Sequence, residues 1–159
     1  MDSLQHVQRH PTTITRRPEA NKDLNGGPQG RQRIRPSATK EHKEKRITLD
    51  QLFTIIGQVE SGNDDTATGD NGKSIGRYQI QKAYYTDALQ YEPGLRKYKY
   101  HQMRNHKIAQ RVMIAYFQRY AKKWTAEELC KLHNGGPKGP SKKATEPYWR
   151  KIQQLGGLS

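Results

Sequence analysis

The stretch SIGRYQIQKAYYTD, residues 74–87, decides the fold of this chain. Residues 63–74, which lead into it, are dense in turn formers and predict loops or a short β-hairpin turned at Asp-Asn-Gly, residues 70–72. Residues 77–80 are then expected to be the returning strand of that hairpin. Residues 83–89 are expected to be helical, so the stretch predicts a hairpin that leads into a helix.

The segment before these turns predicts a helix over residues 49–60. Thr48 and, three residues later, Gln51 form the pattern of a capping box. Apolar side chains then recur at helical spacing up to Val59. Glu60 falls in the last turn of this helix, and Ser61-Gly62 is expected to end it.

The remainder of the chain predicts further helices. Residues 90–104 are basic and rich in tyrosine and are expected to form a surface loop, whereas the apolar stripe of residues 105–122 predicts the central core helix. Thr125 and Glu128 suggest a second capping box, opening a short helix that ends at the turn of residues 133–137. A last helix is expected from about residue 146, with three side chains directed inward: Trp149, Ile152 and Leu155. The fold class is therefore mainly α (α+β).

Composition divides the chain into two parts. Only 31% of the residues are apolar, and residues 1–46 contain four prolines and almost no large apolar side chains. Such a segment cannot offset the entropy lost on ordering. We expect a disordered basic N-terminal arm over residues 1–46, followed by one folded domain over residues 47–159. The arm is a candidate for binding nucleic acid or a scaffold, although a solvated flexible arm would have the same composition.

The formal net charge of +14 favours anionic partners: nucleic acid, acidic lipid headgroups or an acidic cell-wall polymer. Cys130 is the single cysteine, so no intramolecular disulfide can form. No apolar stretch is long enough for a membrane span, and no secretion signal is recognisable. His101 and His106 lack metal-ligand spacing and are expected at the surface, so we expect neither a metal nor a cofactor.

Several polar residues could carry chemistry. A carboxyl group at the end of an apolar helix, such as Glu60, is a candidate general acid, because partial desolvation raises its pKa. The ordinary alternative is a solvated residue at a helix end. A second carboxylate could come from three aspartates of the polar loop, which could equally serve only the turns: Asp64, Asp65 and Asp70.

The turn at residues 133–137, His-Asn-Gly-Gly-Pro, could also form part of a site. Its two glycines let backbone groups approach a ligand closely, while the His and Asn side chains supply hydrogen bonds. The alternative is a helix C-terminal cap with a satisfied histidine. Tyr148-Trp149 is expected to pack in the core.

Read together, these segments resemble the invertebrate-type (i-type) lysozymes. That family carries an E-S-G helix end, an S-x-G-x-[FY]-Q-I-x-x-x-Y segment and an H-N-G-G-P-x-G turn followed by a Y-W pair. This chain has the same motifs in the same order, at residues 60–62, 74–84, 133–139 and 148–149. The family is typically secreted and rich in disulfides, and this chain departs from it in both respects. A protein associated with a virion or released by lysis is therefore expected in preference to ordinary secretion.

The resemblance implies a lysozyme-like domain with two lobes around a cleft and a short β-hairpin in one lobe. It places the catalytic acid at Glu60 and the second carboxylate at Asp70, with Asp65 as the fallback. It also implies a set of substrate-binding residues, with the first two on the cleft floor and the others on the opposite wall: Tyr78, Gln79, His133, Asn134, Gly135 and Gly136.

The implied function is that of a bacteriolytic peptidoglycan hydrolase, a muramidase that cleaves the β-1,4 bond between N-acetylmuramic acid and N-acetylglucosamine. One alternative is a lytic transglycosylase, which needs only the glutamate and releases an anhydro product. Another is a catalytically silent lysozyme-like module with a structural or nucleic-acid-binding role. Activity of a Glu60 variant separates the silent module from the two enzymes.

Overall fold

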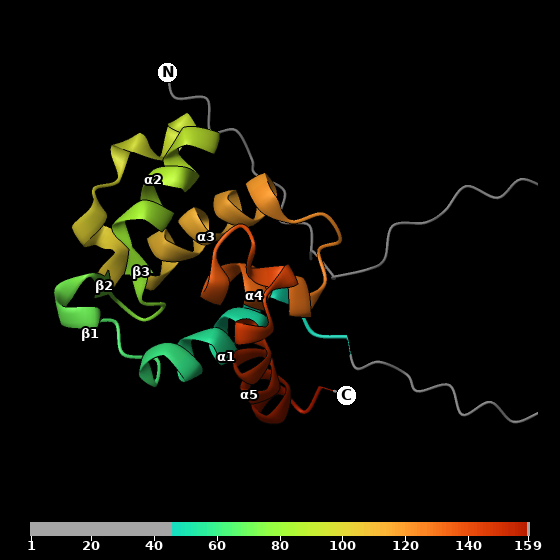
Figure 1. Ribbon diagram of the computed structural model, residues 1–159. Helices are drawn as coiled ribbons and strands as arrows, with labels where there is room; N and C mark the ends of the chain where they lie inside the picture. Colours follow the sequence, from blue (N-terminus) through green and yellow to red (C-terminus); the bar gives the residue numbers. More distant parts are fainter. Residues whose placement is uncertain (1–45, 159) are drawn as a thin grey trace, which may run out of the picture.

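The computed structural model describes residues 46–158. The arm expected over residues 1–46 therefore lies outside the described residues, apart from Arg46. The described part consists mainly of helices, with one small antiparallel sheet (Figure 1). None of the helices in this part is long and apolar enough to cross a membrane.

Five α-helices and three two-residue strands make up the regular structure. The α-helices are α1 (Leu49–Ser61), α2 (Lys82–Tyr91), α3 (His106–Tyr120), α4 (Ala126–Gly135) and α5 (Glu146–Gly156). The strands are β1 (Thr68–Gly69), β2 (Ser74–Ile75) and β3 (Ile80–Gln81). Short 3-10 helices lie between them: η1 (Asp70–Gly72), η2 (Pro93–Lys97), η3 (Tyr100–Arg104), η4 (Gly139–Ser141) and η5 (Lys143–Thr145).

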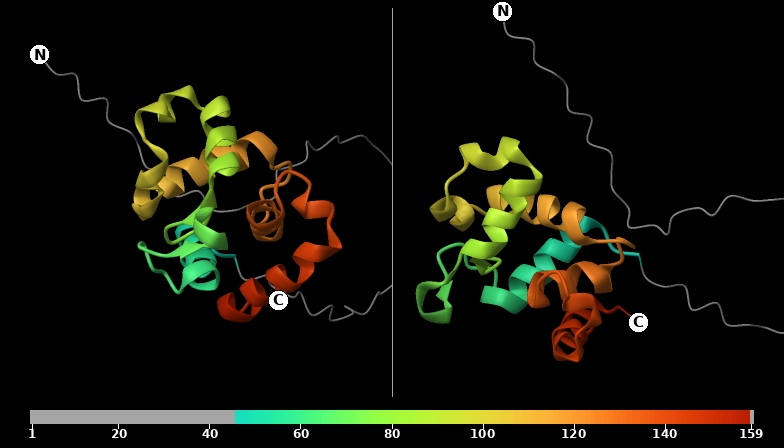
Figure 2. Two further views of the ribbon diagram at one scale, coloured as in Figure 1. Left: turned by 60° about the vertical axis from the view of Figure 1, so that its left-hand side comes forward. Right: turned by 45° about the horizontal axis from the view of Figure 1, so that its top comes forward.

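The elements are arranged in two lobes, as expected. The sheet, α2, η2 and η3 form one lobe, and α1, α4 and α5 form the other, with α3 packed against both α2 and α4 (Figures 1 and 2). Apolar side chains from α1, α3, α4 and α5 meet in the core. The members without solvent exposure include Ile56, Val112, Met113, Leu129 and Ile152.

The predicted start and end of α1 are confirmed. The Gln51 N–H donates to Thr48 Oγ1 at 3.2 Å, and the Thr48 N–H donates to Gln51 Oε1 at 2.8 Å, which is a complete capping box. Gly62 ends the helix in the left-handed conformation, with φ of 68°. Glu60 therefore stands in the last turn, at the edge of the lobe.

The expected hairpin is a three-stranded antiparallel sheet in the order β1-β2-β3. The turn at residues 70–72 is confirmed, but the returning strand is β2 and not residues 77–80. Gly76 and Gln79 have positive φ values of 77° and 48°, which no extended strand accommodates. Residues 77–79 therefore turn the chain from β2 into β3.

Two other predictions about local structure are wrong. Residues 90–104 are not a plain surface loop, because η2 and η3 bury Leu95 and Met103. The second capping box is incomplete. Thr125 caps α4, but the Glu128 carboxylate accepts hydrogen bonds from the N–H groups of residues 122–124 and not from that of the cap residue.

The predicted inward face of the last helix is correct only in part. Ile152 is fully buried and Trp149 is partly buried against the core. Leu155 is 57% exposed and points away from the core. The end of α5 still lies against α1, but it is Gly156 that faces it, because a Cβ there would lie 2.9 Å from Cδ1 of Ile55.

Candidate active site

An open cleft of about 420 Å³ lies between the two lobes. Both lobes and α3 contribute side chains to it. Its lining residues are Glu60, Asp70, Ser74, Gln79, Gln81, Ala83, Tyr84, Asp87, Tyr116 and residues 133–137. All of the predicted site residues except Tyr78 are among them. The cleft is the size of a small-molecule site, and many of its lining side chains are polar.

Glu60 enters the cleft from the last turn of α1 and is held by two donors. The Tyr148 hydroxyl donates a hydrogen bond to Oε1 of Glu60 at 2.7 Å. Nε2 of His133 lies 3.5 Å from the same oxygen. The Glu60 side chain is 19% exposed, so one edge of the carboxyl group remains open to the cleft.

Opposing effects set the pKa of Glu60. Burial raises this pKa, but the hydrogen bond from His133, the charge of His133 when protonated, and the hydrogen bond from Tyr148 lower it, and the net pKa lies below the ordinary value. The sequence predicted a raised pKa from desolvation alone. That prediction is wrong, because helix periodicity does not show the two donors that α4 and α5 supply.

Asp70 faces the same cleft from η1. Its Oδ2 accepts hydrogen bonds from the Ser74 hydroxyl and, at 3.2 Å, from Nε2 of Gln81. These hydrogen bonds, that of Ser74 first, lower the pKa of Asp70, so it is ionised at neutral pH. Its backbone has φ of 50°, in the left-handed region that Asp adopts more readily than most residues other than glycine, as suits a turn.

The other two aspartates of the polar loop do not line the cleft. Asp64 accepts hydrogen bonds from the N–H and hydroxyl of Thr66. Asp65 pairs with Arg77 and His106. The structure thus places Asp70, and not Asp65, in the cleft with Glu60.

The opposite wall comes from the end of α4. Helix α4 continues through Gly135, so His133 and Asn134 lie in its last turn and not in a turn after it. Nε2 of His133 lies 3.1 Å from the backbone oxygen of Tyr78. A carbonyl oxygen only accepts hydrogen bonds, so Nε2 carries a hydrogen and points it toward Tyr78 and Glu60.

Comparisons with known proteins agree with this geometry. Residues 50–155 match the protein family described as Destabilase. Over 106 residues the chain is 34% identical to "Invertebrate-type lysozyme 6" of Caenorhabditis elegans, a match that covers 59% of this chain and 72% of that protein. The chain belongs to the invertebrate-type lysozyme family. The chain is also 30% identical to "Lysozyme 1" of Crassostrea virginica, but this match covers only 47% of the oyster protein and 54% of this chain.

A solved structure shows the same fold. A lysozyme crystal structure, that of Aeromonas hydrophila PliI in complex with Meretrix lusoria lysozyme, superposes with a TM-score of 0.58 at 28% identity. The superposition covers 68% of this chain and 90% of that chain. This i-type lysozyme is a glycoside hydrolase.

Tyr78 does not line the cleft of this lysozyme. Its side chain is 1% exposed, its ring centroid lies 6.0 Å from that of Phe53, and its hydroxyl accepts a hydrogen bond from Nε2 of Gln110 at 2.8 Å. The resemblance implied a place for Tyr78 on the cleft floor, and that prediction is wrong for the side chain. Tyr78 supports the site through its backbone oxygen, which orients His133.

Reasoning from the sequence missed several residues of the lysozyme cleft and its surroundings, and four of them contribute directly to the site. Tyr84 and Tyr116 stack with ring centroids 3.7 Å apart, and both line the cleft. The helical stripe assigned Tyr116 to the core only. Gln81 orients Asp70, and no pattern in the sequence indicated this contact. Tyr148 contacts Glu60, although the sequence suggested core packing alone.

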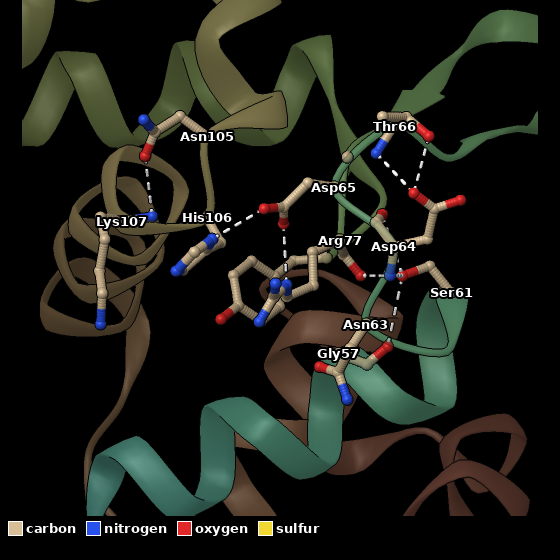
Figure 3. A network of polar contacts seen from close by, with 12 residues as sticks. Gly57, Ser61, Asn63, Asp64, Asp65, Thr66, Arg77, Asn105, His106 and Lys107 are labelled. Atoms are coloured by element: carbon tan, nitrogen blue, oxygen red, sulfur yellow. Dashed lines mark hydrogen bonds and ion pairs between the residues drawn. The ribbon is translucent and has the colours of Figure 1, made fainter.

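A polar network fixes the loop that carries Asp70 to α3. Figure 3 shows Asp65 between Nε of Arg77 and Nδ1 of His106, each at 2.8 Å. The backbone oxygen of Arg77 in turn accepts a hydrogen bond from the Ser61 hydroxyl at 2.8 Å. The network therefore joins α1, the polar loop and α3 beside the lysozyme cleft.

We expect Asp65→Asn to destabilise the lysozyme in a pH-dependent way. Burial raises the pKa of Asp65, but the hydrogen bonds and charges of His106 and Arg77 lower it by more than burial raises it. The pKa of Asp65 in the folded state therefore lies below that in the unfolded state. The stabilisation is therefore present above the unfolded pKa and is lost as pH falls through the folded pKa. Because the pair is partly exposed, we expect a loss of about 1 kcal/mol at pH 7. Urea unfolding at pH 7 and pH 3 measures it, and an equal loss at both pH values would contradict the charge-based explanation.

Among residues 46–158, no group of three or more His, Cys, Asp or Glu side chains is arranged to hold a metal ion.

Proposed function

We propose that this lysozyme is a bacteriolytic muramidase that cleaves the β-1,4 bond between N-acetylmuramic acid and N-acetylglucosamine in peptidoglycan. The observation that carries the proposal is the pair of unlike carboxyl groups facing one cleft. Glu60 is mostly buried and is held by neighbouring side chains, whereas Asp70 lies on an exposed turn and is ionised. Two carboxyl groups in different environments are what glycoside hydrolysis uses.

In this proposal Glu60 is the general acid. Its proton moves to the glycosidic oxygen, the bond from that oxygen to C1 of the sugar breaks, and the bonding electrons stay on the leaving oxygen. Asp70 stabilises the positive charge that develops at C1 or forms a bond to it, and a water molecule then adds to C1 and gives its proton to the Glu60 carboxylate. A bound sugar displaces water from Glu60, and the desolvation raises its pKa toward the protonated form that the reaction needs.

The charge of the chain supports the choice of a bacterial wall as substrate. Lys and Arg outnumber Asp and Glu by 29 to 15, and residues 93–126 contain no acidic side chain. Such a surface is attracted to anionic wall polymers, and the attraction weakens as salt screens it. Clearing of bacterial cell walls and mass analysis of the released muropeptides tests the proposal. Reducing-end fragments support it, whereas a folded protein that is inert on several wall types contradicts it.

Asp70→Asn is expected to reduce the hydrolysis rate at least ~100-fold, because the neutral amide no longer stabilises charge in the transition state. The measurement is the initial rate of reducing-end release from purified peptidoglycan. Asp50→Asn is the matched control, since it makes the same chemical change on an exposed residue at the start of α1, outside the cleft, and should leave activity largely unchanged. If Asp70→Asn remains nearly fully active and releases anhydro products, the enzyme is a lytic transglycosylase.

A further inference from the structure

The two oxygen atoms of the Glu60 carboxyl group have different surroundings. Tyr148 and His133 both approach Oε1, at 2.7 Å and 3.5 Å. Oε2 has no hydrogen-bond partner in the described part of the chain, and Glu60 lines the cleft. The two donors come from α5 and α4, so two helices orient one oxygen and leave the other open to a ligand.

Tyr148 can act only as a donor to Glu60. It is 9% exposed, and its hydroxyl has one partner among the described residues, Oε1 of Glu60. Burial and the neighbouring charge of Glu60 raise the pKa of Tyr148, so its hydroxyl keeps its proton at every working pH. A phenol has one proton to donate, and this proton is directed at Oε1.

The remaining titratable groups around Glu60 cannot replace this contact. Nε2 of His133 is shared with the Tyr78 oxygen and lies at the limit of hydrogen bonding to Glu60. The hydroxyl of Tyr84 is directed at Nδ1 of His133, at 3.5 Å. Asp70 acts on Glu60 through charge alone, and the Cys130 thiol, whose pKa is raised by burial and by the charge of Glu60, stays neutral.

We propose that Tyr148 is a positioning residue for the acid: it holds Oε1 of Glu60, so that Oε2 carries the proton and delivers it to the glycosidic oxygen. This inference rests on the proposed function of Glu60. A carboxylic acid hydrogen on Oε2 leaves Oε1 able to accept from Tyr148 in both protonation states. The same contact therefore fixes the carboxyl group before and after proton transfer.

The test is Tyr148→Phe, which keeps the buried ring and removes only the donor. Loss of the donor destabilises the ionised carboxylate, so the pKa of Glu60 and the basic limb of kcat/KM are expected to move up by about one pH unit. We expect kcat at the optimum to fall about tenfold from poorer orientation, with little change in KM. A loss of packing alone would change stability without moving the pH profile.

Tyr85→Phe is the matched control. Tyr85 is also buried and donates a 2.7 Å hydrogen bond, but to the backbone oxygen of Tyr98, outside the cleft. It should lose a similar amount of stability and keep the wild-type pH profile. Carbon NMR titration of the Glu60 carboxyl group in wild type and both variants gives the same answer without using activity.

The outcomes separate the two proposals. An upward shift of the Glu60 titration in Tyr148→Phe, absent in Tyr85→Phe, supports the positioning role. Identical Glu60 titrations in wild type and Tyr148→Phe, or equal shifts in both variants, overturn it. Failure of the proposed function would appear elsewhere, as activity that survives in Glu60→Gln.

Discussion

Glu60→Gln is expected to abolish nearly all hydrolysis, with a loss of at least ~100-fold and up to ~10⁴-fold in kcat/KM. The amide has almost the same shape as the carboxylic acid and can still accept the Tyr148 hydrogen bond, but it cannot give a proton to the glycosidic oxygen. Because the folded state lowers the pKa of Glu60, the ionised carboxylate is stabilised there, and we expect the neutral amide to lower the free energy of unfolding at pH 7 while leaving the protein folded. Reducing-end release from peptidoglycan and urea unfolding measure the two effects separately.

Glu92→Gln is the control for this experiment. Glu92 is exposed after α2, and the structure gives its side chain no hydrogen bond or ion pair among the described residues. The same chemical change there should leave the rate unaltered. If Glu60→Gln folds normally and hydrolyses peptidoglycan within a few-fold of wild type, Glu60 is not the acid and the proposed function fails.

Gly76→Ala is expected to lower the free energy of unfolding by about 3 kcal/mol. Gly76 has φ of 77°, which an L-residue adopts at a cost. A Cβ at this position would also lie 2.3 Å from the backbone oxygen of Met103 and 2.9 Å from its carbonyl carbon. Met103 is fully buried in η3, so neither partner can move away cheaply.

Gly62→Ala separates the two causes. Gly62 has a similar φ of 68°, but an added Cβ would meet no atom within 4 Å. It should therefore lose only about 1 kcal/mol, the cost of the backbone conformation. Urea denaturation of both variants gives the comparison. If both variants lost the same free energy of unfolding, this would show that η3 shifts to make room for the added methyl group.

The parts of the fold that the sequence predicted are those set by local chemistry. The capping box at Thr48 and the left-handed glycine at residue 62 fix both ends of α1, and the apolar stripe of α3 fixes its buried face. The sheet could not be predicted in the same way. Its strands are two residues long, and their bounds depend on the positive φ of Gly76 and Gln79. A glycine in the sequence suggests a positive φ, but a glutamine does not.

Site residues could be predicted from the sequence where they depend on neighbours in the chain, and could not where they depend on contacts between distant residues. Glu60 could be predicted as a candidate acid because it lies in the last turn of an apolar helix. The residues alone left three aspartates open, and only the resemblance favoured Asp70, because a turn-rich loop gives no sign of which carboxylate faces inward. The Tyr148 contact joins residues 88 positions apart, and no local pattern encodes such a pair.

The thiol of Cys130, the single cysteine of the chain, can report local opening of helix α4. Cys130 is fully buried on α4, and burial together with the charges of Glu60 and Glu127 raises its pKa, so the reactive thiolate is suppressed in the native state. A labelling reagent can reach this sulfur only when the helix detaches from its neighbours. The rate of modification therefore reports how often α4 opens in the native protein. Since α4 also carries His133, the cleft loses this wall in each opening event.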